Sequence, residues 1–301
     1  MAYMILTVTN LSKYIRSRKV INNISLEVEP GQLYGILGPI GSGKTTFLSM
    51  ILGATVPSSG SYQWFDAATN SSHRRNIGSI LGKTIFCPWL SATANLAMVA
   101  SIRRVPKPKN AINAALDLVN FPKNSTHAFA KYSLSKQKKL ALAACILGNP
   151  EVLVLDAPTD GIDDNGSEEI REIILKMSHM GKTIILASHS LNEIENICSH
   201  VAILNHGKIL QYGTVKSVLV QENIVEVAAD DKTGLINALN DNPFQSTYEQ
   251  DGNMFHVLLP EGIKSSEINT YLVGKSIGVS HLVFKEKSKE AHYLELLGKD
   301  L

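Results

Sequence analysis

Hydrophobic and polar residues alternate along the start of the chain, and this alternation predicts antiparallel strands. The alternating runs lie at 5–8, 20–21 and 24–28. Pro30-Gly31 then predicts a turn, and the continuous apolar run 33–37 predicts a buried strand. A helix is expected at 47–52, directly after a glycine-rich segment.

The middle of the chain changes to longer helices and short apolar strands. Residues 83–150 have the pattern of helices, with loops near 106–108 and Pro122. Beyond them, expected strands at 152–156, 183–187 and 201–204 are separated by helical patterns at 167–179 and 191–198. Strands that alternate with helices predict a mainly parallel sheet.

The end of the chain has a smaller pattern of its own. It contains expected strands at 224–229 and 279–285, expected helices at 234–239, 264–273 and 288–297, and a hairpin that joins 247–250 to 254–259 across Asp251-Gly252. We therefore predict two domains. The larger spans 1–220, with a helical subdomain at about 83–150, and the second is a small α+β domain at 221–301.

Composition and charge narrow the class of protein. About 44% of the residues are hydrophobic and 19% are charged, as in ordinary globular proteins. The net charge of +2 is too small for a nucleic-acid binder, so no nucleic-acid partner is expected. Cys87, Cys145 and Cys198 form no C-x-x-C pair, which indicates free thiols in a reducing compartment. With neither a leader pattern nor an apolar run of roughly 18–20 residues, the chain is expected in the cytosol.

The segment from Gly38 to Thr45 matches the pattern G-x-x-x-x-G-K-[ST] between a predicted strand and a predicted helix. In such a loop, backbone N–H groups face phosphates, Lys44 supplies charge to the β- and γ-phosphates, and the Thr45 hydroxyl ligates Mg²⁺. The expected ATP-binding residues are Gly38, Gly41, Ser42, Gly43, Lys44, Thr45 and Thr46. Asp156 ends an apolar strand and is expected to hold Mg²⁺ through water, so Thr45 and Asp156 are the predicted metal-binding residues.

Three further motifs resemble those of ABC-type ATPases. Residues 157–163, which follow Asp156, resemble the Walker B and D-loop run of that family, usually written L-D-E-P-T-x-G-L-D. The tripeptide at 187–189 resembles the switch histidine segment, and 132–137 stands where the family has its signature L-S-G-G-Q. Order and spacing agree with the family over residues 5–220. The resemblance implies a P-loop α/β fold with an antiparallel β subdomain and a helical subdomain.

The resemblance is closest to exporters of the bacitracin and lantibiotic type. That group often reads S-L-G at the signature and carries a C-terminal extension, and its I-G … P-x-L-T-A-x-x-N-L run is similar to residues 77–96. The resemblance implies an ATP-binding subunit at the cytoplasmic face of the membrane. It would drive a separate membrane permease and export antimicrobial or toxic peptides. It also implies that two such subunits, identical or different, dimerise head to tail and close on two ATP molecules.

The resemblance assigns roles to individual residues. His189 and Asp156 belong to the catalytic machinery, with His189 as the switch that contacts the γ-phosphate. Ser133 and Ser135 in the signature and Asp163 in the D-loop are expected to contact nucleotide. Each ATP would lie between the Walker motifs of one subunit and the signature of the other.

The chain departs from the family pattern at positions that act in hydrolysis. Ala157 stands where the family has the glutamate that polarises the attacking water, and a missing general base costs roughly 10²–10⁴-fold in rate. Gly82 stands where the family has the Q-loop glutamine or glutamate. Leu134, Ser135 and Lys136 replace the last three residues of the signature. We therefore expect ATP binding with weak or absent hydrolysis.

Two explanations fit Ala157: a natural subunit that works with a competent partner, or an engineered substitution that traps ATP. The further departures at Gly82 and in the signature favour the first. Two aromatic residues also have alternative interpretations. Tyr14 is the candidate for stacking on adenine, although ungapped alignment with the family places Ile15 at that position. The alternative is that Tyr14 is an ordinary packed tyrosine. Trp89 is the candidate contact with the permease and is otherwise a core residue of the helical subdomain.

Two other functions remain as alternatives to a transporter subunit. One is a soluble ABC protein that acts as an ATP-dependent regulator, on ribosomes or DNA for example. Such proteins usually carry two cassettes or a long coiled-coil insert, and this sequence has neither. The other is a P-loop kinase, which the signature and D-loop motifs disfavour.

Overall fold

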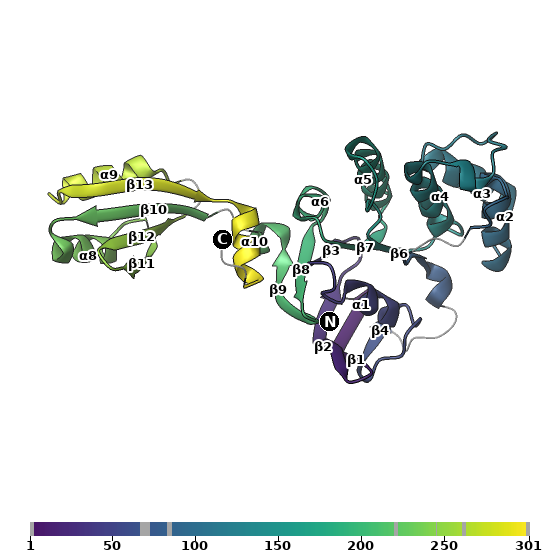
Figure 1. Ribbon diagram of the computed structural model, residues 1–301, viewed down its shortest axis with the longest axis horizontal. Coiled ribbons are helices and arrows are strands. Elements are labelled where there is room, and N and C mark those ends of the chain that lie inside the picture. Colours follow the sequence, from purple (N-terminus) through teal and green to yellow (C-terminus); the bar gives the residue numbers. More distant parts are fainter. Residues whose placement is uncertain are drawn as a thin grey trace. The chain divides into compact units, whose positions relative to one another are not determined.

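The computed structural model describes residues 3–66, 73–82, 86–219, 222–244, 246–260 and 263–298. The chain divides into two compact units, residues 1–218 and residues 219–301. Figure 1 labels the helices and strands of both units. The larger unit carries the motifs that predict nucleotide binding.

A mainly parallel sheet forms the centre of the larger unit, with strand order β5-β6-β7-β3-β8-β9. Its strands are β3 (Leu33–Leu37), β5 (Ile77–Ile80), β6 (Val152–Asp156), β7 (Thr183–Ser188), β8 (His200–Asn205) and β9 (Lys208–Thr214). Neighbours from β5 to β8 pair in parallel, and β9 adds an antiparallel edge. All residues of β3, β6 and β7 are buried, which explains their continuous apolar runs. The predicted parallel sheet is confirmed.

A smaller antiparallel sheet has the strand order β2-β1-β4. It consists of β1 (Leu6–Ile15), β2 (Arg18–Val28) and β4 (Ser59–Trp64), and it confirms the antiparallel strands predicted at the start of the chain. One hydrophobic core joins this sheet to the central sheet and to helix α1 (Lys44–Ile51). Within that core, the buried Trp64 indole N–H donates to the carbonyl of Ile51 over 2.7 Å, which fixes β4 against α1.

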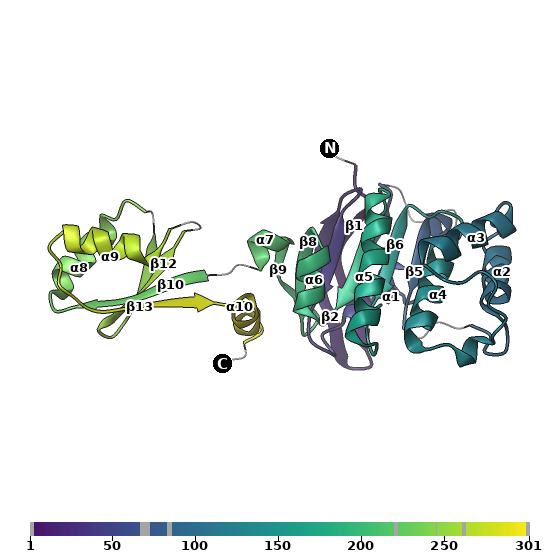
Figure 2. The ribbon, with the colours of Figure 1, turned by 90° about the horizontal axis from the view of Figure 1, so that it is seen from above.

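Helices cover the face of the central sheet that is opposite α1 and the smaller antiparallel sheet. Further helices form a subdomain at the β5 edge (Figure 1, Figure 2). The covering helices are α5 (Asp164–His179) and α6 (Leu191–Ile197). The subdomain contains α2 (Ala92–Ile102), α3 (Pro108–Leu118) and α4 (Leu134–Ile146). Shorter turns are η1 (His73–Asn76), η2 (Phe129–Lys131) and α7 (Val215–Val218). Arg103 ties the subdomain to the sheet by donating to the carbonyls of Ile77 and Cys145, each 2.9 Å away. Residues 83–85 of the predicted helical region lie outside the described residues.

The smaller unit has an antiparallel sheet with strand order β11-β12-β10-β13. Its elements are β10 (Glu222–Ala229), α8 (Lys232–Asn240), β11 (Thr247–Asp251), β12 (Met254–Leu259), α9 (Ser265–Gly274), β13 (Val279–Lys287) and α10 (Lys289–Leu296). Strands β11 and β12 form the predicted hairpin. Leu235 and Leu239 of α8 and Ile268 and Leu272 of α9 join the sheet residues in one core. The predicted α/β fold with antiparallel, helical and small α+β parts is confirmed. Within the described ranges, no helix is both long and apolar enough to cross a membrane.

Candidate nucleotide-binding site

The predicted phosphate-binding loop connects β3 to α1. At its start, the N–H of Gly38 donates to the carbonyl of Ser188 over 3.2 Å, which anchors the loop to the end of β7. At its end, Gly43 has a φ of 110°, and a Cβ there would lie only 2.8 Å from Cδ1 of Ile21. This position therefore requires glycine. Helix α1 begins at the next residue, so its first backbone N–H groups are available to an anion.

Lys44 supplies the positive charge of this loop. Its ammonium donates to the carbonyls of Gly38 at 2.7 Å and Pro39 at 3.0 Å. Burial lowers the pKa of Lys44, while the carboxylates of Asp156 and Asp160 act in the opposite direction. The ammonium is thus partly removed from water, where its attraction for a phosphate is stronger than on an open surface.

Thr45 and Asp156 bring a hydroxyl and a carboxylate together beside Lys44. Thr45 Oγ1 donates to Asp156 Oδ2 over 2.8 Å, although the two residues are far apart in sequence. Asp156 is 7% exposed at the end of β6. Hydroxyl and carboxylate oxygens are the ligands that Mg²⁺ prefers. This donor set therefore fits Mg²⁺, which when bound would neutralise charge on the nucleotide phosphates.

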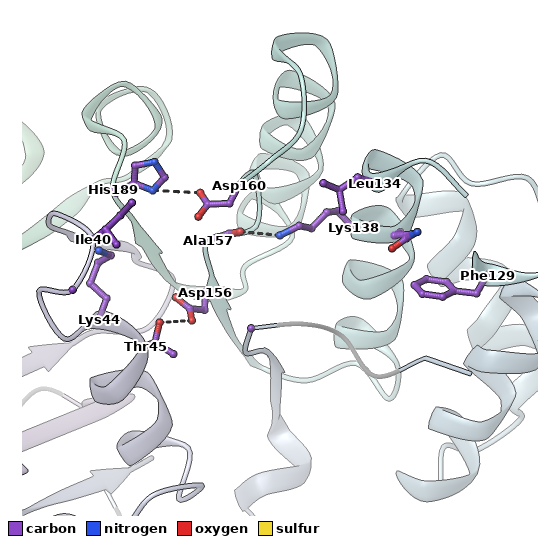
Figure 3. A pocket seen from close by; sticks show the side chains of 13 residues that line it. Ile40, Lys44, Thr45, Phe129, Leu134, Lys138, Asp156, Ala157, Asp160 and His189 are labelled. Atoms are coloured by element: carbon purple, nitrogen blue, oxygen red, sulfur yellow. Dashed lines mark hydrogen bonds and ion pairs between the residues drawn. The ribbon is translucent and has the colours of Figure 1, made fainter. Parts of the chain in front are cut away.

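A cavity of about 660 Å³ lies at these residues (Figure 3). We call one side of it the P-loop wall, formed by Gly41, Lys44, Thr45 and Asp156. We call the other side the α4 wall, formed by Gly82, Leu134, Gln137, Lys138 and Ala157. The remaining lining residues are Ile40, Phe129, Asp160 and His189.

At positions 157 and 82 of the α4 wall, the motifs predict side chains that carry oxygen. The chain has Ala157 and Gly82 there, and neither has a side-chain oxygen. Ala157 has a φ of 47°, a left-handed conformation that costs a non-glycine residue roughly 1–2 kcal/mol. Three hydrogen bonds hold it there. Its N–H donates to the carbonyl of Ala187 over 2.9 Å, and its carbonyl accepts from Lys138 Nζ over 3.0 Å and from the Asp160 N–H over 3.3 Å. Gly82 leaves open space, because a Cβ there would meet no atom within 4 Å.

Two polar contacts join the segment after β6 to the segment after β7. His189 Nδ1 lies 3.4 Å from Asp160 Oδ1, and both side chains are half-exposed. Thr159 Oγ1 donates to Oε1 of the buried Glu193 over 2.8 Å. Burial raises the pKa of Glu193. These contacts fix His189 and Asp160 beside each other at the cavity.

Comparison with known proteins identifies the family. A family model described as ABC transporter matches residues 21–160. The bacitracin transport ATP-binding protein BcrA of Bacillus licheniformis is 31% identical over 301 residues, which cover 98% of this chain and 97% of that protein. The chain belongs to the ABC transporter ATP-binding proteins. It is therefore an ATP-binding subunit of an ABC transporter, as its motifs predicted.

Further relatives of this ABC subunit agree with the assignment. The lantibiotic transport ATP-binding protein SrtF of Streptococcus pyogenes is 30% identical over 205 residues, which cover 68% of this chain and 89% of that protein. The solved dimer of the ATP-binding cassette MJ0796, in a post-hydrolysis state with ADP and Pi, superposes with a TM-score of 0.62 at 21% identity. It covers 70% of this chain and 99% of its own. This second likeness supports the fold.

Only some of the predicted ABC motif residues lie together at the cavity. Gly41, Lys44, Thr45, Asp156 and His189 line the cavity described above. Gly43 and Thr46 line an adjoining hollow of about 500 Å³, together with Arg18, Lys19 and His206. Gly38 and the buried Ser42 form the base of the loop.

The other predicted nucleotide contacts do not line either of these two hollows. Ser133 caps α4 by accepting from the Lys136 N–H over 3.4 Å, and Asp163 caps α5 by accepting from the Gly166 N–H over 3.2 Å. Ser135 lies in the first turn of α4. Their contact with nucleotide across an ABC dimer stays a prediction. The ring of the half-exposed Tyr14 faces the Lys19 ammonium at 5.6 Å, and its stacking on adenine also stays a prediction.

Besides Asp160, the motifs alone missed another charged residue of the cavity, Lys138. A signal for it was present in the sequence. Once a helix begins after Ser133, residues 134, 137 and 138 are spaced i, i+3 and i+4 and share one face. Leu134, Gln137 and Lys138 all line the cavity from that face.

Proposed function

We propose that this chain binds Mg·ATP and hydrolyses it very slowly, and that ATP binding closes a dimer that drives a separate membrane permease. The observation that carries the proposal is the composition of the cavity. Lys44, Thr45 and Asp156 supply the phosphate and Mg²⁺ ligands on one wall, while Ala157 offers neither a base nor a group to orient water on the other. Within this function, residues 1–220 act as the ATP-binding domain and 221–301 as an accessory domain.

The proposed cargo is an antimicrobial or toxic peptide that is exported. The relatives named for bacitracin transport and lantibiotic transport support this proposal, and the first of them matches nearly the whole length of this chain. The proposed location is the cytoplasmic face of the membrane, where the chain is held by its permease and by a second ATP-binding subunit.

A groove of about 860 Å³ lies between the helical subdomain and the end of α5, and it supports the proposed contact with the permease. Its lining is mostly apolar and includes Ala111, Ala114, Leu118, Ile146, Leu147 and Met180. It runs between α3, the end of α4 and the end of α5, and Met180 is 60% exposed in it. A short amphipathic helix of the permease would bury its apolar side there.

The test of ATP binding is a titration of a fluorescent ATP analogue with Mg²⁺ against the wild type, Lys44→Ala and Lys109→Ala. Lys109 is an exposed lysine on α3 and serves as a matched control. We expect Lys44→Ala to weaken binding at least about 100-fold, because it removes a charge-assisted contact from a partly buried site. Equal affinities for wild type and Lys44→Ala would refute the proposal.

Co-purification with a membrane permease separates a transporter subunit from an ATP-dependent regulator. Full-length chain expressed with its own permease should elute with it in detergent. Elution of the ATP-binding chain alone would favour the regulator.

A further inference from the structure

Lys138 places a second ammonium in the cavity, on the wall opposite Lys44. Helix α4 begins after Ser133, so Lys138 lies in its second turn on the same face as Leu134 and Gln137. Figure 3 shows Lys44 and Lys138 approaching from opposite sides, with Asp156 and Asp160 between them. Burial lowers the pKa of Lys138, as it does that of Lys44, and the charges of Asp156 and Asp160 act in the opposite direction on both.

The ammonium of Lys138 is held weakly and is available to an anion. It donates to a neutral group, the carbonyl of Ala157, over 3.0 Å. Within the described residues it forms no ion pair, whereas the neighbouring buried Lys139 pairs with Glu169 of α5 at 2.9 Å. A phosphate oxygen carries negative charge, so it attracts the ammonium more strongly than a neutral carbonyl oxygen does. A phosphate within reach would therefore displace the carbonyl.

Ala157 makes this position of the lysine possible. A glutamate at 157 would put a carboxylate next to the ammonium and engage it in an ion pair. With alanine there, residue 157 offers the ammonium its backbone carbonyl, which accepts from Lys138 Nζ over 3.0 Å.

We propose that Lys138 binds the γ-phosphate of ATP from the α4 wall and so makes this subunit prefer ATP to ADP. The inference rests on the proposed Mg·ATP binding. Lys44 and the loop N–H groups would hold the phosphates that ATP and ADP share. Lys138 instead lines the cavity with Ala157 and His189, the positions that the family resemblance places near the γ-phosphate. An ammonium there stabilises bound ATP without activating water, which suits a subunit that retains its nucleotide.

The experiment compares the affinities of Mg·AMP-PNP, a non-hydrolysable ATP analogue, and Mg·ADP by isothermal titration calorimetry. The proteins are wild type, Lys138→Gln, Lys138→Met and the exposed-lysine control Lys109→Gln. We expect both Lys138 variants to bind Mg·AMP-PNP about tenfold more weakly, because one charge-assisted hydrogen bond is lost, and to bind Mg·ADP within about twofold of wild type. Lys138→Met keeps the aliphatic stem, so it guards against a packing effect of Lys138→Gln.

Each other outcome decides against the inference. If wild type binds both nucleotides and the variants keep its preference for AMP-PNP, Lys138 does not contact the γ-phosphate. If the variants lose both nucleotides equally, Lys138 acts on the shape of the site. If wild type itself binds neither nucleotide, the proposed function fails first, and that result is distinct from the other two.

Discussion

The P-loop wall and the α4 wall of the same cavity differ in how many of the predicted functional groups they carry. The P-loop wall has a glycine and a lysine of the phosphate-binding loop, and a hydroxyl and a carboxylate in contact at 2.8 Å. The α4 wall has a glycine and an alanine where the motifs predict groups that act on water, and it adds a lysine instead. Binding a nucleotide requires mainly positive charge and backbone N–H groups, whereas hydrolysis also requires a base near the γ-phosphate. This difference between the walls is the reason why the proposed function combines nucleotide binding with very slow hydrolysis.

The sharpest way to break this comparison is to return a base to the α4 wall. Ala157→Glu alone should raise the rate of ATP hydrolysis less than about tenfold, because Lys138 Nζ lies beside residue 157 and would pair with the new carboxylate. Ala157→Glu combined with Lys138→Gln should raise kcat further, towards about 100-fold, which is the low end for a general base. The measurement is phosphate release at saturating Mg·ATP.

Ala157→Gln has nearly the same size as the glutamate and no base, so it is the control. A full gain from Ala157→Glu alone would show that Lys138 does not neutralise the carboxylate. If neither glutamate variant gains activity, Gly82 or the altered signature also limits hydrolysis. Robust turnover by the wild type, abolished by Lys44→Ala, would show that another residue serves as the base.

The two walls also differ in how far the sequence predicted them. The loop residues of the P-loop wall belong to one contiguous motif, and Asp156 ends an apolar strand, so both could be predicted from local sequence. The α4 wall is assembled from three segments, around Gly82, Lys138 and Ala157, that meet only in the folded chain. Lys138 could have been found from the helical phase that starts at Ser133, but its distance to Ala157 could not.

The fold shows the same division between local and long-range information. The buried strands β3, β6 and β7 were predicted from their apolar runs, but β4, β5 and β9 were not. Half-exposed residues alternate with exposed ones along β9, and β4 is mostly exposed, so neither has an apolar run. Helix α5 begins at Asp164, earlier than the predicted 167, because Asp163 caps it.

A second comparison concerns the two candidate contacts with the permease. Trp89 is 75% exposed, so the alternative that it packs in the core of the helical subdomain is wrong. The apolar groove at α3 is the other candidate. Ala114→Glu places a charge on an exposed position of that groove, and we expect it to reduce co-purification of the permease about tenfold, since a buried unpaired charge is costly.

The control for this variant is Asn110→Glu, which adds the same charge to an exposed position on the same helix outside the groove. Trp89→Ala should weaken the complex less and leave the melting temperature near that of the wild type. Unchanged permease binding by Ala114→Glu, with a strong loss for Trp89→Ala, would move the contact from the groove to the loop before α2.

The smallest expected effect concerns the smaller unit. Ending the chain at residue 220 should change the affinity for Mg·ATP by less than about twofold, because the P-loop wall and the α4 wall come entirely from residues of the larger unit. The smaller unit has a hydrophobic core of its own around Phe255, and this supports its treatment as a separate domain.

Affinity is measured by the same titration, and the oligomeric state by light scattering with and without Mg·ATP. A shift from dimer to monomer at unchanged affinity would assign the accessory domain a role in dimerisation. A large loss of affinity in a truncated chain that still melts cooperatively would contradict its independence from the nucleotide site.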